Sequence, residues 1–123
     1  MIKDFLKKID FANDGIVESI SFKNFKSVEI KIIVHHYAEK KKFDVTLNLD
    51  SIYEIKMVNP PNVTSPILSG GVQIYEINEF YYIDLNPVDL EDYEPIEDLK
   101  HSEIYFVGKL LEYKIEENSE DFK

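Results

Sequence analysis

Residues 15–37, GIVESISFKNFKSVEIKIIVHHY, decide the fold of this chain. Apolar and polar side chains alternate along both halves, with the period of two that a pleated strand requires. The first half places on one face Ile16, Glu18, Ile20 and Phe22. Residues Lys23 to Lys26 separate the halves, and Asn24 can adopt the positive φ of a tight turn. The stretch predicts a β-hairpin with local contacts, to which the chain adds further strands.

A third and a fourth strand are predicted after this hairpin. Residues 43–49 place Phe, Val and Leu at every second position, which indicates a strand with one core face. The apolar phase then shifts by one residue near Asp50-Ser51. A bulge or corner there would bend the chain into a fourth strand that ends near residue 58. The three prolines of residues 59–66 predict a surface connection.

Three more strands follow in the C-terminal half. Residues 72–77 and 80–85 have strand character, and Asn78-Glu79 separates them as a two-residue hairpin loop would. Residues 102–117 form a long final strand in which Gly108 is expected to mark a bulge.

The whole chain, residues 1–123, is expected to form one domain. Apolar residues at positions 2, 5, 6 and 9 have helical spacing and predict a short amphipathic helix that covers one end of the sheet. The predicted fold class is mainly β: an antiparallel sandwich or partly open barrel of about seven strands with one short N-terminal helix.

Composition and charge exclude several functional classes. The chain has no Cys, which excludes disulfides, thiolate metal sites and thiol nucleophiles. Its net charge is −10, with +3 on residues 1–42 and −13 on residues 43–123, and all 14 basic residues are Lys. This charge repels phosphates, so we expect neither direct nucleic-acid binding nor membrane binding, and we expect attraction of a basic protein partner.

We expect a cytoplasmic location. The opening MIKDFLKKIDF is interrupted by charge and lacks the continuous apolar core of a signal peptide. No apolar run approaches the roughly 18 to 20 residues that span a bilayer.

No motif points to catalysis, a metal or a cofactor. His35 and His36 are neighbours on a strand and point to opposite faces, so surface histidines are favoured over a shared metal site. Six acids between Asp89 and Asp98 resemble a calcium loop in density but lack its Gly and Glu positions. We therefore predict no catalytic residue, no metal and no cofactor.

The acidic run after Asn86 has two further interpretations. It is either a solvated acidic loop or a protein-binding surface, because Leu90, Tyr93 and Ile96 lie among its carboxylates. Asp84 should share a face with Phe80 and Tyr82, where a hydrogen-bonded Asp at the edge of the core is favoured over a catalytic one.

Several phrases of the sequence resemble a family of small acidic bacterial immunity proteins of polymorphic-toxin systems. The phrases are FANDGIVESISFKN, KSVEIKIIVHHY, KFDVTLNLDSIYEIKMV and SEIYFVGKLLEYKI. The family opens with a Phe-His-Asp phrase, matched here by Phe11, Asn13 and Asp14, with Asn13 in place of the His. The family then has a strand that begins with Phe, matched by Phe43.

The resemblance implies a cytoplasmic inhibitor that binds a cognate toxin, often a nuclease, and blocks its active site. An acidic chain suits a basic nuclease, because opposite charges accelerate association. The expected partner-binding residues are tyrosine anchors with charged companions: Tyr81, Tyr82, Asp84, Asp89, Glu91, Asp92, Tyr93 and Glu94.

Two alternatives of other classes stay open at this point. The first is a structural or assembly protein that self-associates through its β-sheet into a homo-oligomer, with no catalytic activity. The second is an enzyme or calcium-binding module that uses the acidic run, which requires a metal-dependent rise in melting temperature.

Overall fold

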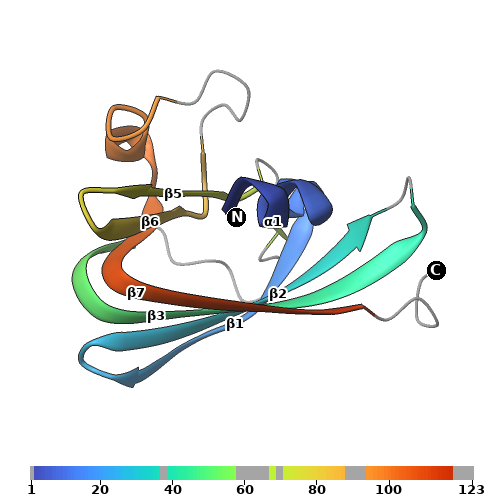
Figure 1. Cartoon of the computed structure of the whole chain (residues 1–123), viewed down its shortest axis with the longest axis horizontal. Helices are drawn as coiled ribbons and strands as arrows, with labels where there is room; N and C mark the ends of the chain where they lie inside the picture. The colour runs from blue at the N-terminus through green and yellow to red at the C-terminus, as the bar shows by residue number, and fades with distance from the viewer. Residues whose placement is uncertain (1, 37–38, 58–66, 69–70, 88–93, 118–123) are drawn as a thin grey trace.

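The computed structural model describes residues 2–36, 39–57, 67–68, 71–87 and 94–117. Its seven strands form one antiparallel sheet in the order β4-β1-β2-β3-β7-β6-β5 (Figure 1). The elements are α1 (Ile2–Lys8), η1 (Asp10–Ala12), β1 (Gly15–Asn24), β2 (Ser27–His36), β3 (Lys41–Met57), β4 (Ile67–Leu68), β5 (Gln73–Ile77), β6 (Phe80–Asp84), η2 (Leu99–His101) and β7 (Ile104–Glu117). The predicted mainly β, partly open antiparallel fold with a short N-terminal helix is confirmed.

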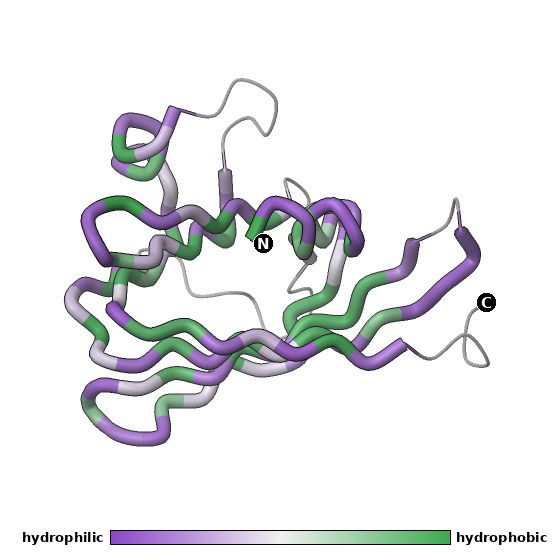
Figure 2. The backbone as a smooth tube through the Cα atoms, viewed as in Figure 1, coloured by the Kyte–Doolittle hydropathy of each residue, from purple (hydrophilic) through white to green (hydrophobic). Residues whose placement is uncertain are grey.

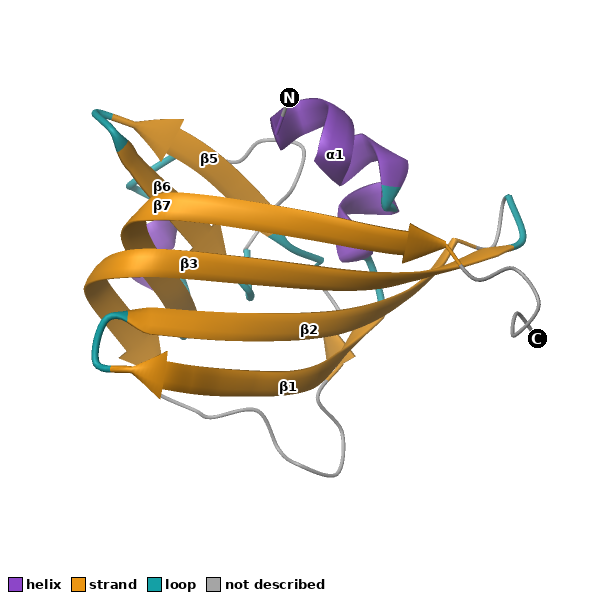
Figure 3. Cartoon of the chain, turned by 60° about the horizontal axis from the view of Figure 1, so that its bottom comes forward, coloured by secondary structure: helices purple, strands orange, loops and turns teal. Residues whose placement is uncertain are grey.

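The sheet curls over one hydrophobic core. Figure 3 shows β1, β2, β3 and β7 as a curved layer, with β5 and β6 behind it and α1 at the open side. Residues from α1, from both parts of the sheet and from η1 belong to a single buried cluster. The helix contributes Phe5 and Leu6, and the Phe5 ring lies 4.3 Å from the Tyr113 ring. The helix therefore covers the core where the sheet does not close.

The period of two in β2 and β3 becomes one buried face. Figure 2 shows hydrophobic and hydrophilic positions alternating along these strands. The inward side chains are almost inaccessible to solvent: Val28, Ile30, Ile32, Val34, Phe43, Val45, Leu47 and Leu49. Side chains between them face outward, because successive residues of a strand point to opposite faces.

The predicted hairpin is confirmed, with two local differences. A register shift between Val17 and Ser19 turns Val17 inward, whereas Ile16 is 37% exposed. The prediction that Ile16 shares a face with Ile20 was therefore wrong, because the bulge exchanges the faces. Asn24 does not adopt a positive φ; its Oδ1 accepts a hydrogen bond from the Lys26 N–H at 2.7 Å, which stabilises the turn instead.

The phase shift at Asp50-Ser51 is the point where the sheet bends. Asp50 and Ser51 both face away from the core, and Ser51 has a φ of 55°. A register shift between Ile52 and Glu54 places one extra residue on β3. The predicted bulge is confirmed, but the chain beyond it is the second half of β3 and not a separate fourth strand.

Gly108 lies opposite this bulge on β7. Gly108 pairs with Ile52 of β3, and the extra residue of the bulge lies on β3. The prediction of a bulge in the final strand at Gly108 was therefore wrong, because the bulge is in the strand that pairs with it. A β-carbon on Gly108 would lie 2.8 Å from Leu49 Cγ and 2.9 Å from the Asp50 carbonyl oxygen. A glycine is required here because the two backbones approach too closely for a side chain.

The loop between β5 and β6 is the predicted two-residue hairpin. Asn78 has a φ of 52° and Glu79 a φ of 71°. Two successive left-handed residues are typical of the turn whose twist matches a tight hairpin. This hairpin joins the sheet through β6, which pairs with β7 only as far as Gly108.

We predict that Gly108→Ala lowers the free energy of unfolding by about 1 to 3 kcal/mol, because the new methyl group overpacks the bend. Urea unfolding measures the change. Glu112→Ala, at an exposed position of the same strand, is the matched control and should change stability by less than about 0.5 kcal/mol. Equal stability of Gly108→Ala and wild type would contradict the tight approach of β3 and β7.

Candidate partner-binding surface

Tyr81 and Tyr82 point to opposite sides of β6. Tyr81 packs against the main core, on the inner side of the sheet. Tyr82 packs on the outer side, against a second cluster formed by Leu99, Tyr105 and Val107. The two predicted anchors therefore cannot contribute to one contact, because neighbours on a strand face opposite ways.

The outer side of β5, β6 and β7 is covered in part by the segment from residue 94 to residue 101. The Tyr75 and Tyr82 rings stack in parallel, with their centroids 4.9 Å apart. The Ile96 N–H donates a hydrogen bond to Tyr75 Oη at 3.1 Å, and Lys56 Nζ donates to the Lys100 carbonyl oxygen at 3.2 Å. These contacts hold the segment beside the stacked tyrosines.

Tyr53 and Leu110 extend this surface past the bend. Tyr53 is 74% exposed and Leu110 is 61% exposed. The Tyr53 ring lies 5.3 Å from the Phe80 ring, and Lys109 Nζ lies 5.6 Å from the Phe80 centroid on the same side. Sequence analysis did not single out Tyr53, because simple alternation places it on one face with Ile55 and Met57. The register shift between Ile52 and Glu54 makes it the extra residue of the bulge, where it is exposed.

We call this outer side the tyrosine face. It consists of Tyr53, Tyr75, Phe80, Tyr82, Leu110 and the segment from residue 94 to residue 101. Tyrosine side chains next to carboxylates are frequent anchors at protein interfaces, because the ring is large and its hydroxyl tolerates a wet rim.

Asp84 shares its side of β6 with Tyr82, as predicted, but it is not a surface residue. Its exposed fraction is 0%, because Ser102 covers it. Ser102 Oγ donates a hydrogen bond to Asp84 Oδ1 at 2.6 Å, and the Asn86 N–H donates to the same oxygen at 2.9 Å. Asp84 is a buried, hydrogen-bonded Asp, which matches the structural interpretation and corrects its inclusion among contact residues.

The structure describes the last three of the six acids in the acidic run, Glu94, Glu97 and Asp98. Glu94 and Glu97 are exposed, and the Glu94 N–H donates to Asp98 Oδ2 at 2.8 Å. The predicted residues Asp89, Glu91, Asp92 and Tyr93 lie outside the described residues. Glu94 and Glu97 thus belong to the segment that packs on Tyr75 and Tyr82.

A part-buried polar pair joins β3 and β7 beside the tyrosine face. Tyr105 Oη donates a hydrogen bond to Glu54 Oε2 across the β3–β7 ladder. This hydrogen bond, together with burial, raises the pKa of Tyr105 to about 12. The hydroxyl is therefore protonated at neutral pH and ties the second half of β3 to β7.

Tyr81 lines a separate groove on the inner side, between α1 and the ends of β5 and β7. The groove has a volume of about 570 Å³, and its other lining residues include Ile2, Lys3, Ile74 and Leu111. The neighbouring Glu76 carboxylate raises the pKa of Tyr81. Tyr75 also lines this groove, so the groove borders the tyrosine face at that residue, while Tyr81 reaches it from the inner side.

The histidines end a strand, as expected. His35 and His36 close β2 and lie opposite Lys42 and Lys41. Within the described ranges, no three His, Asp or Glu side chains come together in a way that could hold a metal ion. No helix in the same ranges is long and apolar enough to cross a bilayer.

No protein-family model, curated protein or solved structure matches this chain.

We predict that Ser102→Ala lowers the free energy of unfolding by about 1 to 3 kcal/mol, because the buried Asp84 carboxylate loses a donor. Thermal or urea unfolding measures the loss. Glu103→Ala removes an exposed side chain next to Ser102 and serves as the control, with an expected change within about 0.5 kcal/mol. If both variants unfold like wild type, the Asp84–Ser102 hydrogen bond does not stabilise the fold.

We predict that Glu54→Gln lowers the pKa of Tyr105 from about 12 toward 10, because the negative acceptor is removed. Ultraviolet titration of the phenolates measures this, and Tyr105→Phe identifies the transition by removing it. Since the folded pKa exceeds the unfolded value near 10, wild-type stability should fall as the pH rises from about 10 to 12, and less so in Glu54→Gln. An unmoved transition would contradict the Glu54–Tyr105 contact.

Proposed function

We propose that this protein is an immunity-type binding protein that binds and inhibits a basic toxin, such as a nuclease. The observation that carries the proposal is the tyrosine face, where Glu94 and Glu97 accompany stacked and exposed tyrosines. The net charge of −13 on residues 43–123 supports it, because this part of the chain includes most of the tyrosine face. Such a surface attracts a cationic protein and supplies aromatic contacts after docking.

The contact has a division of roles. Tyr53 and Leu110 are exposed enough to be desolvated by a partner, so they are the proposed apolar anchors. Tyr82 has a different role, because it is half-buried against Leu99 and stacked on Tyr75, so it holds the acidic segment on the sheet. The carboxylates, from Asp89 to Glu97, set the association rate and its salt dependence.

The test begins with capture of partners from the source cell by the tagged full chain, at low and at high salt. The proposal expects one stoichiometric basic protein that is retained at low salt and weakened at high salt. The purified partner should be toxic or catalytically active alone and should lose that activity when this protein is added. A captured partner whose activity is unchanged, or the absence of any partner, would overturn the proposed function.

A charge-matched comparison locates the contact. Changing Asp89, Glu91, Asp92 and Glu94 together to Ser should leave folding intact and slow association with the partner at least tenfold at low salt, as measured by surface plasmon resonance. The control removes four acids from the outer face of the long strands, at Glu18, Glu29, Asp44 and Glu116. Equal effects of the two sets would mean that net charge alone acts and that the tyrosine face is not the contact.

A further inference from the structure

Among the described residues, β1 has a neighbouring strand on both sides only at its start. The strand pairs with β2 along its length, but β4 pairs with only its first two residues, Gly15 and Ile16. For residues 17–24, no second neighbouring strand occurs in the part of the chain that the structure describes. An unpaired strand edge presents backbone donors and acceptors to any strand that can align with it.

The inner side of this edge is apolar and only partly buried. Ile20 and Phe22 face inward, opposite Ile30 and Val28 of β2. Phe22 is nevertheless 49% exposed, although its ring lies 6.4 Å from that of the buried Phe106. A strand added beside β1 would cover Phe22 and extend the core face of the sheet.

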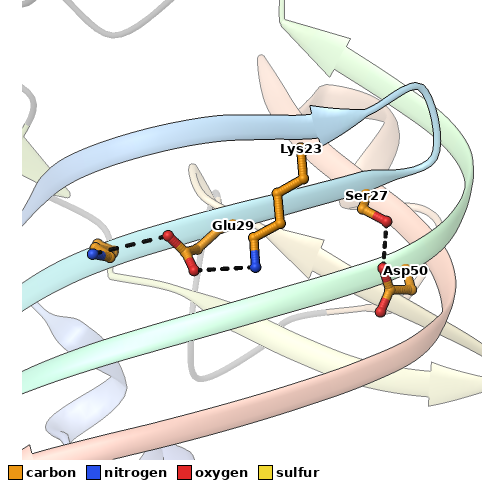
Figure 4. A network of polar contacts seen from close by, with 5 residues as sticks. Lys23, Ser27, Glu29 and Asp50 are labelled. Atoms are coloured by element: carbon orange, nitrogen blue, oxygen red, sulfur yellow. Dashed lines mark hydrogen bonds and ion pairs between the residues drawn. The ribbon is translucent and has the colours of Figure 1, made fainter.

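The charges beside this edge are balanced, in contrast to the chain as a whole. β1 carries one acid, Glu18, and one base, Lys23. Figure 4 shows Glu29 of β2 between two lysines; its carboxylate lies 3.5 Å from Lys23 Nζ and 3.9 Å from Lys31 Nζ. A second copy with a net charge of −10 can therefore approach along β1 without meeting a concentrated acidic surface.

We propose that two copies of this chain pair antiparallel through β1 and form one continuous sheet across a two-fold axis. Side chains that lie opposite each other must point to the same side of the sheet, so paired positions differ by an even number. Placing Ser21 at the axis sets Ile20 of each copy opposite Phe22 of the other, and Ser19 opposite Lys23. This register covers both exposed Phe22 rings and places the small Ser21 pair at the centre.

The same edge limits the assembly to a dimer. Register shifts lie between Val17 and Ser19 and between Phe22 and Asn24, so the regular part of β1 is short. Bulges at both ends twist the strand away from longer pairing. A two-fold contact uses the same patch on both copies and closes on itself, so no further copy can add at this edge.

Cysteine cross-linking of the full chain tests the pairing directly, because the natural chain has no Cys. Opposite residues of antiparallel strands have Cα atoms about 4.5 to 5.5 Å apart, within the range of a disulfide. Ser21→Cys should form a disulfide-linked dimer on oxidation. Glu112→Cys, exposed on the outer side of β7, is the collision control and should form no disulfide-linked dimer on oxidation. Cross-linking of Ser21→Cys no faster than this control would overturn the proposal.

The register has its own control. Lys23→Cys alone should not cross-link, whereas a mixture of Lys23→Cys and Ser19→Cys should form a mixed dimer. A dimer of Lys23→Cys with itself would contradict the register with Ser21 at the axis.

A charge exchange gives a readout without oxidation. Ser21→Lys and Ser21→Glu each place like charges opposite each other, so native mass spectrometry should show at least a tenfold loss of dimer for each variant alone. Their equimolar mixture should regain a heterodimer, and monomers only in that mixture would overturn the proposal. The dimer does not depend on the proposed function, because none of the four acids assigned to partner binding in that test, Asp89, Glu91, Asp92 and Glu94, lies in residues 17–24.

Discussion

The structure depends on the bend that β3 and β7 make together. At this point Ser51 adopts a left-handed conformation and Gly108 admits the facing backbone within contact distance. Two consecutive residues face outward on each strand, Asp50-Ser51 and Lys109-Leu110. The apolar residues beyond the bend therefore point to the core again. Without this change of phase, the apolar residues beyond the bend would point to solvent and the sheet could not enclose a core.

The bend also creates the candidate partner-binding surface. It turns Tyr53 and Leu110 outward on its convex side, beside the rings that β6 contributes. It also makes the sheet incomplete, since β6 pairs with β7 only up to Gly108 and α1 must cover the remaining opening. The bend of β3 and β7 therefore both encloses the core and exposes the aromatic side chains.

Local patterns predicted most of the fold. The period of two predicted the strands, the polar residues between them predicted both hairpins, and the phase shift predicted the bend. Which distant strands pair is not visible in such patterns: β7 lies between β3 and β6 because their apolar faces share one core. Bulges are also hidden, since a single extra residue before Ser19 reversed the expected faces of β1.

The candidate site was predictable only in part, for similar reasons. Neighbouring residues of a strand point to opposite sides, so the sequence itself already predicts that Tyr81 and Tyr82 cannot be anchors of one contact. The burial of Asp84 was different: it depends on Ser102, which is 18 residues away and is brought there by the turn before β7. The hydrogen bond from Asn86 is local in sequence, but the one from Ser102 depends on the tertiary structure.

The two proposed contacts are compatible because they lie toward opposite ends of the sheet. β1 is near one edge of the strand order, whereas β5 and β6, which carry Tyr75 and Tyr82, form the other. Pairing through β1 would use none of the strands that carry Tyr53, Tyr75 and Tyr82. A dimer would then present two acidic surfaces and bind two basic partners, and the gain from bivalency would arise only if those partners were themselves linked. The balanced charge of β1 permits this arrangement, because Glu18 and Lys23 give the paired strands no net charge.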